Sequence, residues 1–269
     1  MSIFQPFEPE EGDRRKRLTL PQVPLRAVLP NLVTLLALCA GLTSLRMTVE
    51  HRFDMAILLI LVAAALDAVD GRIARFLKST SRFGAELDSI ADFVNFGVAP
   101  AVLIYVWSLQ ELRSLGWIAV LVFAICAALR LARFNVALEA ADKPAWEAAY
   151  FVGVPAPAGA IIVMLPLYVE FVVLPQGFMT APVTAIYTVA IGLLLVSRVP
   201  SWSGKVIGRR IARDLVAPLF VCGVLVVALL LSFPWQTLAL LTLAYVGSLP
   251  LSWSAYERQK RETAKRASA

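Results

Sequence analysis

The chain has 269 residues, of which 59% are hydrophobic and 16% charged, and its mean hydropathy is +0.75. Water-soluble domains are roughly half apolar and about a quarter charged, so this composition excludes an ordinary soluble protein and makes lipid the solvent for much of the surface. The net charge of +6 then indicates attraction to anionic membrane lipids, and no nucleic-acid partner is expected. The single histidine, His51, excludes a metal site built on a pair of histidines.

Apolar segments follow one another along the chain, and a helix needs about 20 mostly apolar residues to cross a bilayer. The segments are residues 30–48, 54–76, 84–108, 114–135, 154–174, 180–197, 215–232 and 235–253. The predicted fold is therefore all-α, a polytopic membrane protein with about eight transmembrane helices. A single transmembrane domain, residues 30–255, is expected between a basic N-terminal tail (1–29) and a basic C-terminal tail (256–269).

The distribution of lysine and arginine predicts the orientation. If the N-terminus is cytoplasmic, only Arg46, Arg52 and Arg113 of the 25 basic residues fall on the outer side. Cytoplasmic loops carry an excess of these residues, so both termini are predicted to face the cytoplasm. Residues 201–214 are read either as a short amphipathic helix at the interface or as a basic loop.

Four aspartates lie in two neighbouring apolar segments: Asp67 and Asp70 in the first, Asp88 and Asp92 in the second. Residues three or four apart share one face of a helix, and the short loop between the segments makes the helices antiparallel neighbours. The four carboxylates are therefore predicted to converge near the cytoplasmic surface. Ionisable groups at membrane depth are costly and usually functional.

This convergence suits two kinds of chemistry. Carboxylate oxygens bind hard divalent cations, which can neutralise a diphosphate and stabilise a leaving oxygen. Buried acidic residues also form proton or ion pathways in transporters. Gly71, Ala74 and Gly84 are small enough to let a substrate or a neighbouring helix come close to the backbone.

Residues 67–92 contain the pattern D-x2-D-G-x2-A-R-x8-G-x3-D-x3-D, which resembles the signature of the CDP-alcohol phosphatidyltransferase family. The resemblance implies a divalent metal site for two ions, Mg²⁺ or Mn²⁺. The metal ligands that it implies are Asp67, Asp70, Asp88 and Asp92, of which Asp92 also acts as the catalytic base. It further implies that the CDP-lipid pocket is shaped by Gly71, Ala74, Arg75 and Gly84.

Residues 29–34, 95–101, 128–135 and 151–158 resemble bacterial integral-membrane phosphatidylserine synthases, although Asn95 stands where serine is common. The resemblance implies transfer of a phosphatidyl group from CDP-diacylglycerol to L-serine, with release of CMP. It places the protein in the bacterial inner membrane with its active site facing the cytoplasm, and leaves a homodimer open. Direct displacement without a phosphatidyl-enzyme is expected. A histidine nucleophile would have to be His51, which falls on the outer side of the membrane, opposite the aspartates. The alternatives are the same chemistry with glycerol phosphate, inositol phosphate or choline, and a proton-coupled transporter.

Two further polar groups have competing interpretations. Arg130, Arg133 and Asn135 can bind the acceptor's carboxylate or the diphosphate, since the guanidinium fork suits either anion, or the arginines can be anchors at the membrane surface. Asn31 and Thr34 begin the first helix and can contact the nucleotide of the CDP-lipid, or they can be ordinary polar residues at a helix end.

Overall fold

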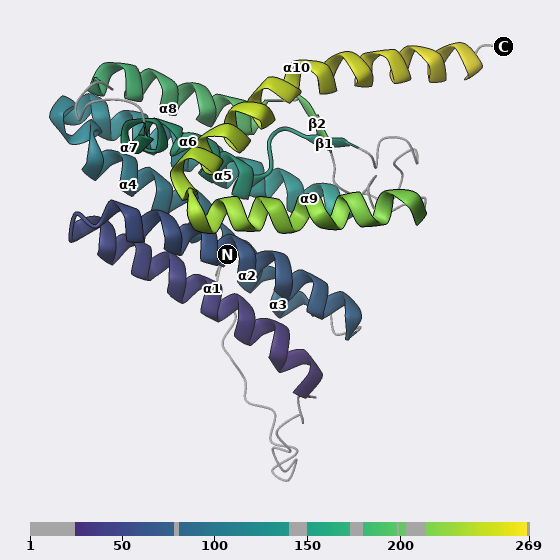
Figure 1. Cartoon of the computed structure of the whole chain (residues 1–269), viewed down its shortest axis with the longest axis horizontal. Helices are drawn as coiled ribbons and strands as arrows, with labels where there is room; N and C mark the ends of the chain where they lie inside the picture. Colours follow the sequence, from purple (N-terminus) through teal and green to yellow (C-terminus); the bar gives the residue numbers. More distant parts are fainter. Residues whose placement is uncertain are drawn as a thin grey trace, which may run out of the picture.

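Figure 1 presents the computed structural model of the chain, an elongated bundle of helices. The structure describes residues 25–77, 81–139, 150–172, 180–197, 199–202 and 213–267. Nearly all of these residues are helical, and every apolar segment predicted from the sequence overlaps at least one helix. The helical character of the fold is therefore confirmed.

The first two helices form an antiparallel hairpin, α1 (Leu25–Val49) and α2 (Phe53–Phe76), and lie side by side in Figure 1. The turn between them passes through His51, whose φ of 57° is in the left-handed region. Ser44 Oγ donates a 2.9 Å hydrogen bond to the carbonyl oxygen of Ala56. Small residues and a satisfied hydroxyl at this crossing allow the two helices to pack closely.

The third apolar segment is one continuous helical stretch with a change of pitch inside it. It consists of α3 (Arg82–Asp92), the π-helix η1 (Phe93–Val98) and α4 (Ala99–Trp107). Pro100 has no amide hydrogen, so the regular i→i−4 bonding pattern cannot continue through it, and the wider π turn directly precedes it. Such turns insert one extra residue into a helix, which the hydrophobic pattern did not predict.

The central helix α5 (Ser114–Glu139) follows the 3₁₀ turn η2 (Leu109–Leu112). It packs on α8 (Ala181–Val196). Two three-residue strands, β1 (Tyr150–Val152) and β2 (Pro200–Trp202), pair antiparallel with Tyr150 opposite Trp202. An all-α fold was predicted, and this small sheet is the exception; strands this short carry no alternating pattern that a sequence reading could detect.

The segment predicted as one helix over residues 154–174 is two short helices, α6 (Ala156–Val163) and α7 (Leu165–Val172). Pro166 explains the break, because it cannot donate to the carbonyl of Ile162 four residues earlier. That carbonyl instead accepts a 2.8 Å hydrogen bond from Tyr187 Oη of α8. A residue from another helix thus satisfies the acceptor that the proline leaves free.

The last two helices are α9 (Arg213–Ser232) and α10 (Pro234–Ala267). Residues 256–267, which belong to the predicted basic C-terminal tail, continue α10 as helix. Most apolar side chains of α9 are exposed, with Leu231 at 81%. Of the basic segment 201–214, residues 203–212 lie outside the described part of the chain, so neither interpretation of it is tested.

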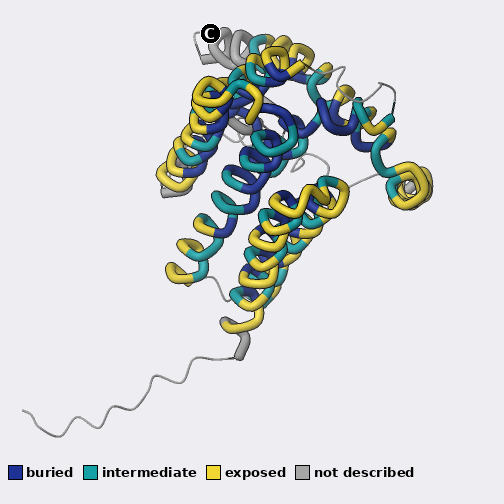
Figure 2. Tube along the Cα trace, turned by 90° about the vertical axis from the view of Figure 1, so that its left-hand side faces the viewer, coloured by how far each residue is buried: buried dark blue, intermediate teal, exposed yellow. Residues whose placement is uncertain are grey.

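Buried residues run through the middle of the bundle and exposed residues cover its outside (Figure 2). The core contains Ile60, Leu103, Phe123 and Leu167, while many large apolar side chains face outward. Within the described part of the chain, the helical stretches long and apolar enough to cross a membrane are Val28–Val49, Arg82–Trp107, Ser114–Val136 and Pro234–Gln259, and shorter apolar helices accompany them. These features identify an integral membrane protein.

Candidate active site

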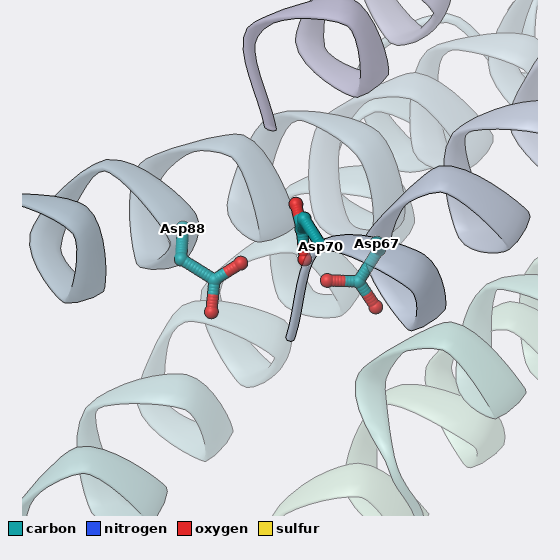
Figure 3. Close-up of side chains that lie close together, drawn as sticks. All are labelled: Asp67, Asp70 and Asp88. Carbon is teal, nitrogen blue, oxygen red and sulfur yellow. The ribbon is translucent and has the colours of Figure 1, made fainter. Parts of the chain in front are cut away.

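Three of the four predicted aspartates come together where α2 and α3 face each other. One carboxylate oxygen each of Asp67, Asp70 and Asp88 lies within 4.8 Å of the other two. Figure 3 shows Asp67 and Asp70 projecting from α2 and Asp88 approaching from α3. The three-residue spacing on α2 places its two carboxylates on one face, and the turn into α3 brings the third to meet them.

Asp92 lies one turn beyond Asp88 and borders the same cluster. Its side chain is in hydrogen-bonding contact with that of Asp67. Asp70 is buried, and the other three aspartates are half-buried. The convergence of the four residues is thus observed, while the roles of Asp92 as ligand and base remain predictions.

The cluster fits a divalent cation. Oxygen-only ligands are what Mg²⁺ and Mn²⁺ prefer, and carboxylates this close together repel one another unless a positive charge lies among them. Asp67, Asp70 and Asp88 are therefore the residues that would hold the metal.

A cavity of about 480 Å³ opens beside the carboxylates between α1, α2 and α3. Its lining residues are Pro30, Asn31, Thr34, Asp70, Gly71, Ala74, Arg75, Ser81, Gly84, Ala85 and Asp88. All six residues for which a CDP-lipid contact was predicted are among them. The two carboxylates in this lining give the cavity an acidic end, and Arg75 is its one basic side chain among the described residues.

The two signature glycines occupy different surroundings. A Cβ atom at Gly71 would meet nothing within 4 Å, so this part of α2 faces open space. A Cβ at Gly84 would lie 2.8 Å from Asn31 Oδ1 and 3.1 Å from Ser81 Oγ, so a larger residue here would displace the side chain of Asn31 where α1 and α3 approach each other. Arg75 Nε donates a 3.0 Å hydrogen bond to the carbonyl oxygen of Gly71.

α1 contributes a direct contact to the carboxylate cluster. Thr34 Oγ1 lies 2.7 Å from Asp70 Oδ2 and 3.1 Å from the carbonyl oxygen of Pro30. The shorter contact makes Thr34 a hydrogen-bond donor to Asp70. Sequence reasoning placed Thr34 near the nucleotide but did not predict this contact, because the two residues belong to different helices.

Arg130, Arg133 and Asn135 do not converge on one point. Arg130 is buried, and its Nε donates a 2.6 Å hydrogen bond to the carbonyl oxygen of Val154. Arg133 Nη1 donates to the carbonyl oxygen of Val196 at 2.7 Å. Asn135 Nδ2 lies 2.8 Å from Ser89 Oγ on α3.

Arg130 also interacts with the acidic cluster. Its guanidinium is close enough to Asp92 and to Tyr245 of α10 to interact with both electrostatically. Tyr245 and Ser89 were not singled out from the sequence, and no local motif marks them. Ser81, also missed, caps α3 by accepting a 3.0 Å hydrogen bond from Gly84 N, and a serine before a helix is a detectable signal.

Comparison with known proteins agrees with this geometry. The sequence matches the family description "CDP-alcohol phosphatidyltransferase" over residues 27–207 and "CDP-alcohol phosphatidyltransferase 2" over residues 214–250. Similar curated proteins, each named CDP-diacylglycerol–serine O-phosphatidyltransferase, occur in Mycobacterium leprae, Mycobacterium bovis and Helicobacter pylori.

These similarities cover different shares of the proteins. The M. leprae relative is 47% identical over 64% of this chain, an alignment that spans only 57% of its own length. The M. bovis relative is 38% identical over 84% of this chain and 78% of its own length. The H. pylori relative is 38% identical over 51% of this chain and 55% of its own length. On the first family match, which includes every signature residue, the chain belongs to the CDP-alcohol phosphatidyltransferase family.

Proposed function

We propose that this chain transfers a phosphatidyl group from CDP-diacylglycerol to the hydroxyl of L-serine, giving phosphatidylserine and CMP. The observation that carries the proposal is the cavity in which the signature residues Gly71, Ala74 and Arg75 lie beside Asp70 and Asp88. The names of the mycobacterial relatives support serine as the acceptor. Family membership supports the reaction class.

In this proposal the cavity holds the CDP group of the donor. Its open backbone at Gly71 leaves room for the nucleotide or diphosphate, and Asn31 and Gly84 close the side toward α1 and α3. Two divalent ions, Mg²⁺ or Mn²⁺, are proposed at Asp67, Asp70 and Asp88, with Asp92 as a further ligand. When bound, such ions offset the charge of a diphosphate and stabilise the departing oxygen.

The displacement step is assigned to residues next to the cluster. Asp92 accepts the proton of the serine hydroxyl while the serine oxygen forms a bond to the lipid-linked phosphorus. The bond from that phosphorus to the CMP oxygen breaks, and CMP leaves. A positioned carboxylate contributes typically about 10²–10⁴-fold to such a step. Arg130, which interacts with Asp92, is suited to bind the carboxylate of serine.

Other alcohols and a transporter are the competing functions. A phosphorylated acceptor calls for several basic groups, whereas Arg75 is the one basic residue among the described lining of the cavity; this supports an acceptor without phosphate. A transporter would move ions in response to a pH gradient and release no CMP. The family signature around the aspartates supports the enzyme.

We further propose about eight membrane crossings, with both termini and the active site on the cytoplasmic side of the bacterial inner membrane. The support is the distribution of lysine and arginine, because in this arrangement only Arg46, Arg52 and Arg113 lie on the outer side of the membrane. A homodimer is proposed from the family resemblance alone.

The test is CMP release from CDP-diacylglycerol by detergent-purified protein, with and without Mg²⁺ or Mn²⁺. Serine, glycerol phosphate, inositol phosphate and choline are supplied in separate reactions. Metal-dependent release with serine alone is the expected result. Release with another alcohol would overturn the acceptor assignment, and no release by folded protein with any alcohol would overturn the reaction.

A further inference from the structure

The hydrogen bond between Asn135 and Ser89 joins the end of α5 to the helix that forms one wall of the cavity. Ser89 Oγ lies 2.8 Å from Asn135 Nδ2 and 2.9 Å from the carbonyl oxygen of Ala85. A serine hydroxyl has one hydrogen to donate, and a carbonyl oxygen can only accept. Ser89 therefore donates its hydrogen bond to the carbonyl of Ala85 and accepts one from the amide of Asn135.

Ser89 occupies a sensitive position in α3. It directly follows Asp88 and lies one turn after Ala85, and both of these residues line the cavity. Of the residues of α3, all of which the structure describes, only Ala91 is buried. Because only one residue of this helix is buried, the polar contact from α5 adds to its contacts with α1 in fixing where it lies.

The C-terminal end of α3 continues into a segment that is packed inside the bundle. The helix passes at Asp92 directly into the π-helix η1, where the regular hydrogen-bonding pattern changes, and π turns are frequent at functional sites. Within this turn Phe96 is fully buried and packs in an apolar cluster with Ala156 and Ala160 of α6. The wall of the cavity is thus held at its C-terminal end by η1 and along its length by α1, and Asn135 adds a polar contact from α5 at Ser89.

We propose that Asn135 is a positioning residue that acts through Ser89. Its amide holds the α3 wall so that Asp88 stays opposite Asp67 and Asp70. This assignment differs from the acceptor-binding role that the sequence predicted for Asn135, because the Nδ2 group is already engaged by Ser89. The assignment rests on the proposed function in one respect, namely that Asp88 is a ligand of the metal.

The test compares Asn135→Leu, Ser89→Ala and the double variant with the wild-type protein. Each single variant should raise the Mg²⁺ concentration for half-maximal CMP release by about threefold to tenfold, the range for one lost hydrogen bond. The KM for serine should stay unchanged. The double variant should be no worse than the more affected single variant, since both changes remove the same contact.

Two controls separate this role from a general loss of structure. Ser89→Thr keeps the hydroxyl and should retain the wild-type Mg²⁺ requirement. Ser254→Ala removes an exposed serine of α10, whose Oγ likewise donates to a backbone carbonyl of its own helix, that of Leu251 at 2.9 Å, and should change nothing. All variants should melt within a few degrees of the wild type.

Mn²⁺ binding measured by electron paramagnetic resonance gives a readout that needs no turnover. Weaker Mn²⁺ binding in both single variants supports the positioning role even if the wild-type protein acts on another alcohol. A raised serine KM in Asn135→Leu with normal behaviour of Ser89→Ala would overturn it and return Asn135 to the acceptor site. Additive effects in the double variant, or unchanged Mn²⁺ binding, would also overturn it.

Discussion

The hydroxyl of Thr34 donates a 2.7 Å hydrogen bond to Oδ2 of Asp70, 36 residues further along the chain. Both residues are buried, and they come from the first two helices of the bundle. Carboxylates that bind metals are usually oriented by hydrogen bonds from neighbouring groups. The contact therefore gives α1 a part in shaping the proposed metal site, in addition to lining the cavity.

Thr34→Val removes this hydrogen bond while preserving the shape of the side chain. Because a buried acceptor then loses its donor, a penalty of about 1–3 kcal/mol is expected. CMP release should fall about tenfold, and the Mg²⁺ requirement should rise. Thr34→Ser, which keeps the hydroxyl, is the matched control and should stay close to wild type. A higher KM for CDP-diacylglycerol with an unchanged Mg²⁺ requirement would instead indicate that Thr34 contacts the nucleotide.

Gly71→Ala should separate folding from function. A Cβ at this position meets no protein atom within 4 Å, and alanine is favoured over glycine inside a helix by about 1 kcal/mol. The melting temperature should therefore be unchanged or slightly higher, while the KM for CDP-diacylglycerol rises because the methyl group projects into the cavity. Thermal unfolding and CMP release on the same preparation provide the measurement. Unchanged kinetics would show that the donor does not approach Gly71.

Asp92→Asn should nearly abolish turnover and leave binding of CDP-diacylglycerol largely intact. An amide cannot take the proton of the acceptor hydroxyl, and loss of a general base costs about 10²–10⁴-fold in rate. Binding of the donor and CMP release are measured separately. Asp54→Asn, which changes an exposed aspartate in the first turn of α2, is the control and should be fully active. Equal losses of binding and rate at Asp92 would argue against its role as a base.

Asn95 and Gly41 form a tight contact that predicts a stability effect. The Asn95 side chain is buried, and its amide atoms have no hydrogen-bond partner among the described residues. A Cβ at Gly41 would overlap Asn95 Oδ1. Gly41→Ala should therefore lower the melting temperature. Asn95→Ser should be neutral or stabilising, because it removes an unsatisfied buried amide whose cost is about 1–3 kcal/mol.

The double variant tests the contact itself. Asn95→Ser should recover part of the stability that Gly41→Ala loses, because the smaller side chain leaves room for the methyl group. Thermal unfolding in detergent measures all three variants. Independent, additive effects would mean that the two side chains do not compete for the same space.

Local periodicity made much of this protein predictable from its sequence. The apolar segments marked the helices because length and hydrophobicity alone decide whether a helix suits the bilayer. Asp67 and Asp70 were expected on one face because their spacing follows the helical repeat. The short loop before α3 then allowed only a narrow range of placements for Asp88, and the structure brings it to the other two.

Where a residue's partner is distant in the sequence, only the tertiary structure could assign it. Three findings depend on which helices are neighbours. They are the Thr34–Asp70 hydrogen bond, the separate partners of Arg130, Arg133 and Asn135, and the hydrogen bond from Tyr187 to the carbonyl oxygen of Ile162. The sequence by itself determined which residues are polar within apolar helices and which of them share a face, since these follow from the repeat of one helix. Packing between helices decided which groups they meet, because side chains far apart in the chain come within hydrogen-bonding distance only when the whole bundle is assembled.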